Sequence, residues 1–201
     1  MKIKKYNCLH NIGRHVNEPV WKPKYQWIND EIPKNISCWL QDSGSLTKQI
    51  IAVCAEQFRV EVVRQQWAIP MLNESLRLQH NPSEYALIRE VLLYCGAESW
   101  VYARTIMPRK TLTGKQRYLA MLGSKPLGEI LFSDPNMQRD ELEIARITQQ
   151  HNIFATALVN DENKLNELWG RRSVFYIGKH KPLLVNEIFL PNILHCQYRH
   201  N

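Results

Sequence analysis

Two long segments of the sequence have the alternating pattern of paired β-strands. One covers residues 85–108, where β-branched and aromatic residues are dense on both sides of Gly96, which marks a turn. The other covers residues 170–191, where two apolar runs are separated by a short polar turn, "GKHK". Antiparallel strands can be joined by such short turns, whereas parallel strands need a long crossover. Two hairpins of this length therefore predict a largely antiparallel β-sheet.

The segments outside the hairpins predict helices and two further strands. Ser45 can cap a helix whose apolar residues, from Leu46 on, recur every three or four positions. The stretch "SKPLGEILF" (124–132) predicts a short helix with Pro126 near its start, while "FRVEVV" (58–63) and "DELEIARI" (140–147) predict strands. Repeated βαβ units are missing. The expected fold class is therefore α+β, a single domain with a largely antiparallel β-sheet flanked by helices.

The 201 residues suit one domain, long enough to bury a core without disulfides or metals. Residues 1–35 contain three prolines and no periodicity, so we expect an irregular N-terminal extension that can lie across a domain formed by residues 36–195. The five cysteines are odd in number, scattered and without a CxxC spacing. This pattern predicts free, mostly buried thiols rather than a disulfide framework.

Charge and hydropathy restrict the location and the partners. No window approaches the roughly 18 apolar residues of a membrane span, and the N-terminal stretch "MKIKKYNCLHNIGRH" lacks the apolar core of a signal peptide. We therefore expect a soluble, cytoplasmic protein without membrane insertion. The net charge of +7 suits either a polyanion or a small anionic substrate. Because the basic residues are spread along the chain, no nucleic-acid partner is expected.

Sequence signatures of common cofactor and catalytic sites are missing. There is no GxGxxG, and neither GK pair (114–115, 178–179) has the preceding glycine of a P-loop. The stretch "SLTK" (45–48) spells the S-x-x-K of penicillin-recognising serine enzymes, but its companion motifs are absent and helix capping explains Ser45 better. The histidines form no HExxH, and the terminal "HCQYRH" (195–200) has the character of a frayed tail. We expect no metal site and no cofactor.

Two charged residues stand on strand faces that are otherwise apolar. Arg89 lies within "YALIREVLLY" (85–94), and Glu187 shares its face with Val185 and Phe189. Because an unpaired buried charge is costly, the two could form a structural ion pair. Alternatively, they could line a closed pocket in which the arginine binds a carboxylate and the glutamate meets a hydroxyl or moves a proton. Arg104, on the partner strand, could add a second cation or be a solvated edge residue.

Five blocks of sequence, in this order, resemble the chorismate pyruvate-lyase family. They are "ISCWLQDSGSLTKQI" (36–50), "LIREVLLYCGAESWVYARTIMP" (87–108), "LGSKPLGEILF" (122–132), "RDELEIARI" (139–147) and "LWGRRSVFYIGKHKPLLVNEIFLP" (168–191). The resemblance implies conversion of chorismate to 4-hydroxybenzoate and pyruvate, which supplies the ring of ubiquinone. It also implies an antiparallel sheet flanked by helices, a product site buried under flaps, a monomer, and no metal or organic cofactor.

The resemblance also assigns site residues by position. The ring-carboxylate arginine of the family matches Arg89 and its site glutamate matches Glu187, the two charges that strand alternation singles out. Two further ligand-contacting positions match Leu46 and Leu127, the latter in a first helical turn whose free N–H groups suit a carboxylate. A second cation for the enolpyruvyl carboxylate could be Arg104 or Arg172.

A different class of function is a non-catalytic sensor of aromatic carboxylates. The fold that the resemblance implies is similar to the effector-binding domain of certain bacterial transcription regulators. Such regulators carry an N-terminal winged-helix DNA-binding domain, which the proline-broken first 35 residues cannot supply. The lyase is therefore the favoured interpretation.

Overall fold

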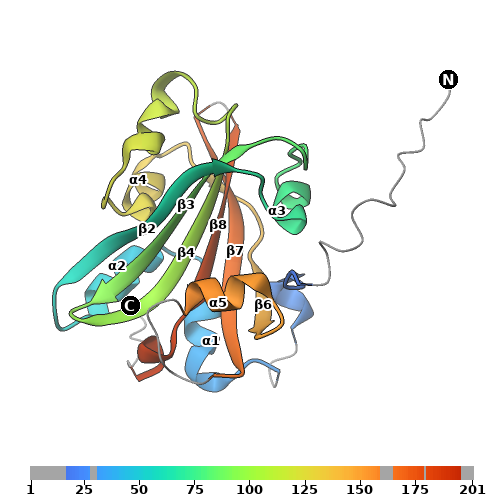
Figure 1. The fold of residues 1–201 in the computed structure, drawn as a ribbon. Helices are drawn as coiled ribbons and strands as arrows, with labels where there is room; N and C mark the ends of the chain where they lie inside the picture. Colours follow the sequence, from blue (N-terminus) through green and yellow to red (C-terminus); the bar gives the residue numbers. More distant parts are fainter. Residues whose placement is uncertain (1–16, 28–30, 159–164, 179, 196–201) are drawn as a thin grey trace.

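An antiparallel sheet of eight strands forms the centre of the computed structural model (Figure 1). The structure describes residues 17–27, 31–158, 165–178 and 180–195. The strand order is β1-β6-β7-β8-β4-β3-β2, and β5 pairs with β7 outside this path. Every pairing is antiparallel, which confirms the expected α+β class.

The strands and helices follow one another along the chain with short connections. The strands are β1 (Lys22–Pro23), β2 (Phe58–Ala68), β3 (Ala86–Cys95), β4 (Glu98–Pro108), β5 (Gln138–Arg139), β6 (Glu143–Thr148), β7 (Glu167–Ile177) and β8 (Lys181–Phe189). The α-helices are α1 (Lys34–Gln41), α2 (Leu46–Val53), α3 (Leu72–Arg77), α4 (Leu127–Ser133) and α5 (Asn152–Ala157). The described residues also form 3-10 helices: η3 (Lys24–Gln26), η4 (Gly114–Met121) and η5 (Pro191–His195).

The two hairpins predicted from the sequence are confirmed as β3–β4 and β7–β8. Gly96 lies in the first turn with φ +58°, a backbone conformation that glycine adopts without strain. Pairing of β4 with β8 joins the hairpins side by side. The middle of the sheet therefore consists of four long, mostly buried strands.

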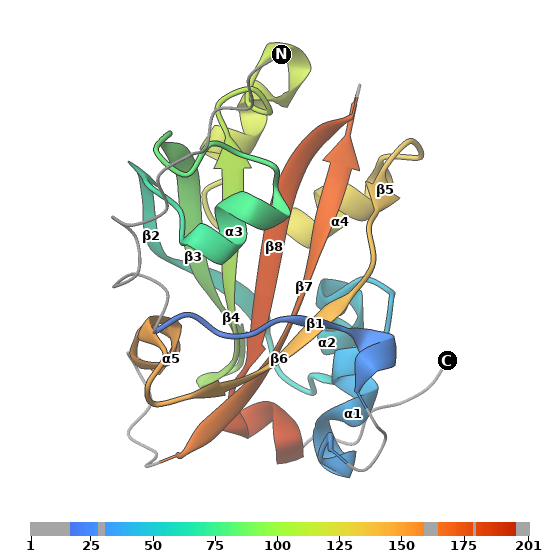
Figure 2. The same ribbon diagram turned by 90° about the vertical axis from the view of Figure 1, so that its right-hand side faces the viewer.

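Helices cover both faces of this sheet (Figure 2). On one face, α1 and α2 pack through Ile36, Leu46 and Ile50 against strand residues, and α4 adds Leu131. On the other face, α5 belongs to one apolar cluster with residues of β3, β4, β6 and β8, and the end of α3 contacts the sheet through Leu78. No described helix is both long and apolar enough to cross a membrane.

The predicted cap of α2 is confirmed, because the Ser45 side chain accepts a hydrogen bond from the Lys48 backbone N–H. Described residues of the predicted N-terminal extension bind to the domain through strand pairing and a hydrogen bond. Lys22 and Pro23 pair with β6, and the Trp27 indole N–H donates to the carbonyl oxygen of Ile144 (3.2 Å). Residues 1–16 lie outside the described part of the chain.

The expectation that the cysteines are free thiols is wrong for one pair, since Cys54 and Cys95 form a disulfide. The cause is strand pairing. Cys54 follows α2 just before β2, and the antiparallel register places Phe58 at the start of β2 opposite Cys95 at the end of β3. Motif spacing cannot show such a pair, because the two residues are 41 positions apart in the sequence. Cys8 and Cys196 lie outside the described residues.

Candidate active site

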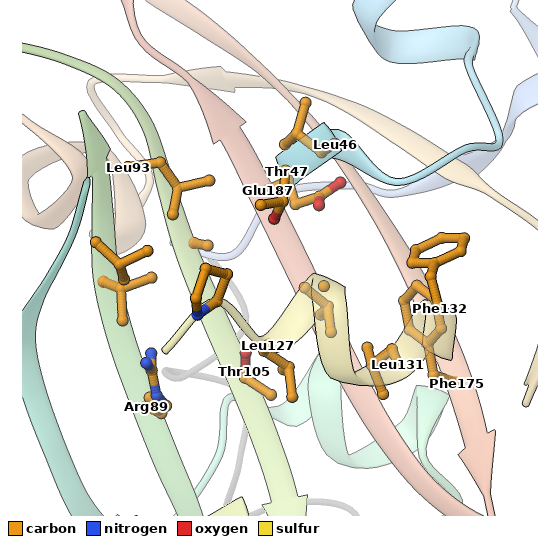
Figure 3. A pocket seen from close by; sticks show the side chains of 16 residues that line it. Leu46, Thr47, Arg89, Leu93, Thr105, Leu127, Leu131, Phe132, Phe175 and Glu187 are labelled. Atoms are coloured by element: carbon orange, nitrogen blue, oxygen red, sulfur yellow. The ribbon is translucent and has the colours of Figure 1, made fainter. Parts of the chain in front are cut away.

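A pocket lies on the face of the sheet that α2 and α4 cover (Figure 3). About 540 Å³ between its lining residues is free of protein atoms, and part of this space is open solvent at the mouth of the pocket. Most of its walls are apolar. Its lining residues are Leu46, Thr47, Val60, Arg89, Val91, Leu93, Ala103, Thr105, Pro126, Leu127, Gly128, Leu131, Phe132, Phe175, Val185 and Glu187.

Strand register brings the two predicted charges to this pocket. Arg89 on β3 lies opposite Thr105 on β4, and Ala103, two residues back along β4, lies opposite Glu187 on β8. Strand and residue spacings then put the Arg89 and Glu187 backbones roughly 12 Å apart. Figure 3 shows the two side chains well separated, as functional groups at the two ends of a ring-shaped ligand would be.

Arg89 is buried, with 2% of its surface exposed, but it forms none of the ion pairs found between described residues. One guanidinium nitrogen, Nη2, donates to the carbonyl oxygens of Gly123 (2.7 Å) and Lys125 (3.2 Å). Nε is buried without a hydrogen-bond partner. Burial lowers the pKa of this guanidinium, although an arginine stays charged in proteins. The side chain is therefore a buried cation that an anionic ligand could neutralise.

Glu187 forms an ion pair with Arg171, not with Arg89. The Arg171 Nε–H donates to Glu187 Oε2 at 2.6 Å, and 18% of the Glu187 side chain is exposed. The two residues lie directly opposite each other in the β7–β8 hairpin. The idea of a structural Arg89–Glu187 ion pair is therefore wrong. Strand alternation does not single out Arg171, because the residue opposite Glu187 depends on the length of the hairpin turn. The observed pairing of Ile177 with Lys181 places Arg171 there.

Arg104 and Arg172 do not reach the pocket, so neither can be the second cation proposed from the sequence. Both lie opposite Asn186, which neighbours Glu187 and therefore points to the other face of the sheet. Arg104 forms ion pairs with two buried carboxylates there. It is not a solvated edge residue either. Arg172 donates to a carboxylate oxygen of Glu143 at 2.6 Å.

The starts of α2 and α4 meet above the pocket. Leu46 begins α2 and Leu127 begins α4, and both line the cavity. The helices touch where Gly128 faces Thr47, since a Cβ added to Gly128 would lie 2.8 Å from Thr47 Oγ1. The close approach of the two helices therefore depends on glycine at position 128.

The described part of the chain holds no group of three or more histidine, cysteine or acidic side chains that could bind a metal ion. Most of the terminal stretch "HCQYRH" lies outside that part. In the pocket, the charged groups are Arg89 and Glu187. Its arrangement can bind a carboxylate at one end and a hydroxyl or a mobile proton at the other.

Comparison with known proteins decides the family. The sequence model of a family described as chorismate lyase matches residues 16–199. The chain belongs to the chorismate lyase family. This match begins within the segment that we assigned to an N-terminal extension.

Curated relatives in the chorismate lyase family are similar along most of their length. The "Probable chorismate pyruvate-lyase" of Psychromonas ingrahamii is 38% identical over 82% of this chain and 89% of the relative. The protein of the same name from Methylococcus capsulatus is 40% identical over 78% of this chain and 94% of the relative.

Solved structures with similar folds include a GntR-family transcriptional regulator from Bacillus cereus. The TM-score is 0.52 with 8% sequence identity, and the similarity covers 73% of this chain and 99% of the regulator. At this identity the likeness shows the fold alone. It confirms the α+β fold expected for a chorismate lyase and gives no support to a sensor function.

Proposed function

We propose that this protein is a chorismate pyruvate-lyase that converts chorismate to 4-hydroxybenzoate and pyruvate. The observation that carries the proposal is a buried arginine without a carboxylate partner, Arg89, facing the same apolar pocket as Glu187. Membership of the chorismate lyase family supports it. The product would serve as the ring precursor of ubiquinone.

The reaction demands groups that this pocket supplies. Chorismate carries a ring carboxylate, a ring hydroxyl and an enolpyruvyl ether with its own carboxylate. Breaking the bond from the ring to the ether oxygen, with loss of the proton on the hydroxyl-bearing carbon, makes the ring aromatic. The departing enolpyruvate becomes pyruvate. Because aromaticity drives this elimination, the protein mainly has to orient the substrate, exclude water and assist the proton.

In the proposed complex, Arg89 binds the ring carboxylate. Its unpartnered Nε gives it a donor to spare for a charge-assisted hydrogen bond. Glu187, at the other end, accepts a hydrogen bond from the ring hydroxyl and helps to move the proton. Leu46 and Leu127 contact the ring from the first turns of their helices. The domain of residues 36–195 acts as a cytoplasmic monomer on this small substrate, without metal, cofactor or nucleic acid.

The test is to incubate purified protein with chorismate, without added metal or cofactor, and to quantify both products by chromatography. Equal amounts of 4-hydroxybenzoate and pyruvate are expected, well above a protein-free control. The Glu187→Gln variant should be at least 10²-fold slower if the carboxylate assists proton movement. If neither product forms, even after denaturation to release bound molecules, the lyase proposal fails.

Gly128→Ala is expected to weaken 4-hydroxybenzoate binding about tenfold or more. The added methyl group would overlap Thr47 Oγ1, and Thr47 is itself buried, so either the Thr47 side chain or the two helices must shift at the pocket. Overpacking of this kind costs about 1–3 kcal/mol. Equilibrium titration with 4-hydroxybenzoate measures the effect. Glu129→Ala, on the exposed side of the same helix, is the control, and equal affinities in the two variants would contradict the prediction.

A further inference from the structure

Arg171 is the most completely buried cation on the pocket side of the sheet, with 0% of its surface exposed. Besides Glu187, its guanidinium reaches two backbone carbonyl oxygens. Nη1 donates to that of Trp39 at 2.7 Å and to that of Asp42 at 2.6 Å. The guanidinium also lies 5.7 Å from the ring centre of Phe189. Arg171 does not line the pocket, so its effect on a ligand must pass through the residues that it holds.

The two carbonyl groups belong to the end of α1. Asp42 is the C-cap of this helix and Trp39 lies in its last turn, where carbonyl oxygens lack partners within the helix. The C-terminal end of a helix also carries partial negative charge. Arg171 therefore neutralises two acceptors of different origin, the Glu187 carboxylate and the end of α1. These contacts offset part of the cost of burying the cation, although Nη2 is buried without a hydrogen-bond partner.

The connection between α1 and α2 is held by a second arginine. Arg139 Nη1 donates to the carbonyl oxygen of Ser43 (2.7 Å), and Arg139 Nε donates to the hydroxyl of Ser173 on β7 (3.0 Å). The connection runs directly into Ser45 and Leu46, where α2 begins at the pocket. Hydrogen bonds therefore link both groups to β7: Glu187 bonds to Arg171 of this strand, and Arg139 links the segment before α2 to Ser173.

We propose that Arg171 is a positioning residue of the active site. It fixes the Glu187 carboxylate by occupying Oε2, which leaves Oε1 as the acceptor for a ligand hydroxyl or a proton. Through Trp39 and Asp42 it sets the position of the α1–α2 connection relative to that carboxylate. This assignment rests on the proposed lyase function and extends it to a residue that does not touch the substrate.

Arg172 offers a matched control. It is the next residue of the same strand, it is also buried, and it also pairs with a glutamate, Glu143. It points to the opposite face, where Nη1 donates to the side-chain oxygen of Asn73 at 2.9 Å. Replacing either arginine removes a similar side chain and one ion pair. Of these two arginines, only Arg171 donates a hydrogen bond to a residue that lines the pocket, Glu187.

The experiment compares kcat and KM for chorismate in Arg171→Gln, Arg171→Lys and Arg172→Gln, each also combined with Glu187→Gln. We expect Arg171→Gln to lower kcat about 10²-fold, the loss that a displacement of a catalytic group by about 1 Å can cause. The KM should change far less, because Arg89 is untouched. Arg171→Lys should recover about tenfold of the loss, since it retains the charge but not the fork of donors. Arg172→Gln should stay within about threefold of wild type once both variants are confirmed to be folded.

The double variant separates positioning from a general structural role. If Arg171 acts through Glu187, adding Arg171→Gln to Glu187→Gln should change kcat by less than about threefold. Equal losses in Arg171→Gln and Arg172→Gln, or losses that multiply in the double variant, would overturn the proposal. If Arg171→Gln does not fold, the kcat losses of Arg171→Lys and Arg172→Lys are compared in the same way. Absence of turnover in the wild type would instead refute the lyase function itself.

Discussion

Arg89→Gln is expected to lower kcat/KM for chorismate by about 10³-fold, because it removes the cation proposed to bind the ring carboxylate. Removing one partner of a buried, hydrogen-bonded charge pair costs about 2–5 kcal/mol, and about 4 kcal/mol corresponds to a factor of 10³. Steady-state kinetics measure the change. Thermal unfolding of the same variant shows whether the domain remains folded.

Arg59→Gln is the control for this prediction. Arg59 lies on the neighbouring strand β2, where its ion pair with Glu61 is half exposed, so its loss should change turnover by less than about twofold. If a folded Arg89→Gln variant kept more than a tenth of wild-type kcat/KM, the ring carboxylate would have to bind elsewhere. The assignment of Arg89 would then be wrong.

The face of the sheet opposite the pocket carries a row of polar residues, one from each of six neighbouring strands. Register places them side by side: Arg64, Glu90, Arg104, Asn186, Arg172 and Glu143. Burial alone would raise the pKa of Glu90, but the hydrogen bond from Arg64 and the charge of Arg104 outweigh it and hold that pKa below its usual value. The row is therefore a network of charged and polar groups that is largely buried except at Arg64, whose side chain is about half exposed.

Glu74→Ala is expected to lower the free energy of unfolding by about 3–5 kcal/mol, the usual cost of removing one partner of a buried ion pair. Glu74 is 0% exposed. From α3 it accepts hydrogen bonds from Arg104 Nε (2.9 Å) and from the Asn186 amide (3.1 Å). Burial alone would lower the pKa of Arg104, but the charges of Glu74 and Glu90 raise it above its ordinary value. Without Glu74, the buried Arg104 guanidinium loses one of the two carboxylates that neutralise its charge.

Urea-induced unfolding measures the effect of Glu74→Ala. Glu61→Ala, which breaks the exposed ion pair with Arg59, should cost less than about 1 kcal/mol and serves as the control. Equal losses in the two variants would show that the buried network contributes no more to stability than a surface ion pair does.

Strand alternation in the sequence was sufficient to find Arg89 and Glu187, because a charge on an apolar strand face stands out whatever the pairing. Alternation within one strand does not fix the register between strands, and this is why the other arginines were misjudged. Arg171 and Arg172 are consecutive, so a decision about which of them faces Glu187 depends on the register of the hairpin. The same uncertainty about register made Arg104 a candidate for the second cation, although its pairing with Asn186 places it on the face opposite the pocket.

Long-range contacts were the other part that the sequence could not supply. The hairpins, the cap of α2 and the start of α4 depend on neighbouring residues, and these were predicted. The Cys54–Cys95 disulfide joins segments that only the β2–β3 pairing brings together. Similarly, the contact between Gly128 and Thr47 depends on how two distant helices pack, which no local pattern reports.

The most direct test of the central claim measures how much the 4-hydroxyl group contributes to binding. Dissociation constants of 4-hydroxybenzoate and benzoate would be determined for wild type, Arg89→Gln and Glu187→Gln. If Arg89 binds the carboxylate and Glu187 the hydroxyl, Arg89→Gln should weaken both ligands by a similar factor and preserve their ratio. Glu187→Gln should weaken 4-hydroxybenzoate selectively and bring the ratio close to one. A ratio unchanged by Glu187→Gln, or benzoate binding unchanged by Arg89→Gln, would contradict the account.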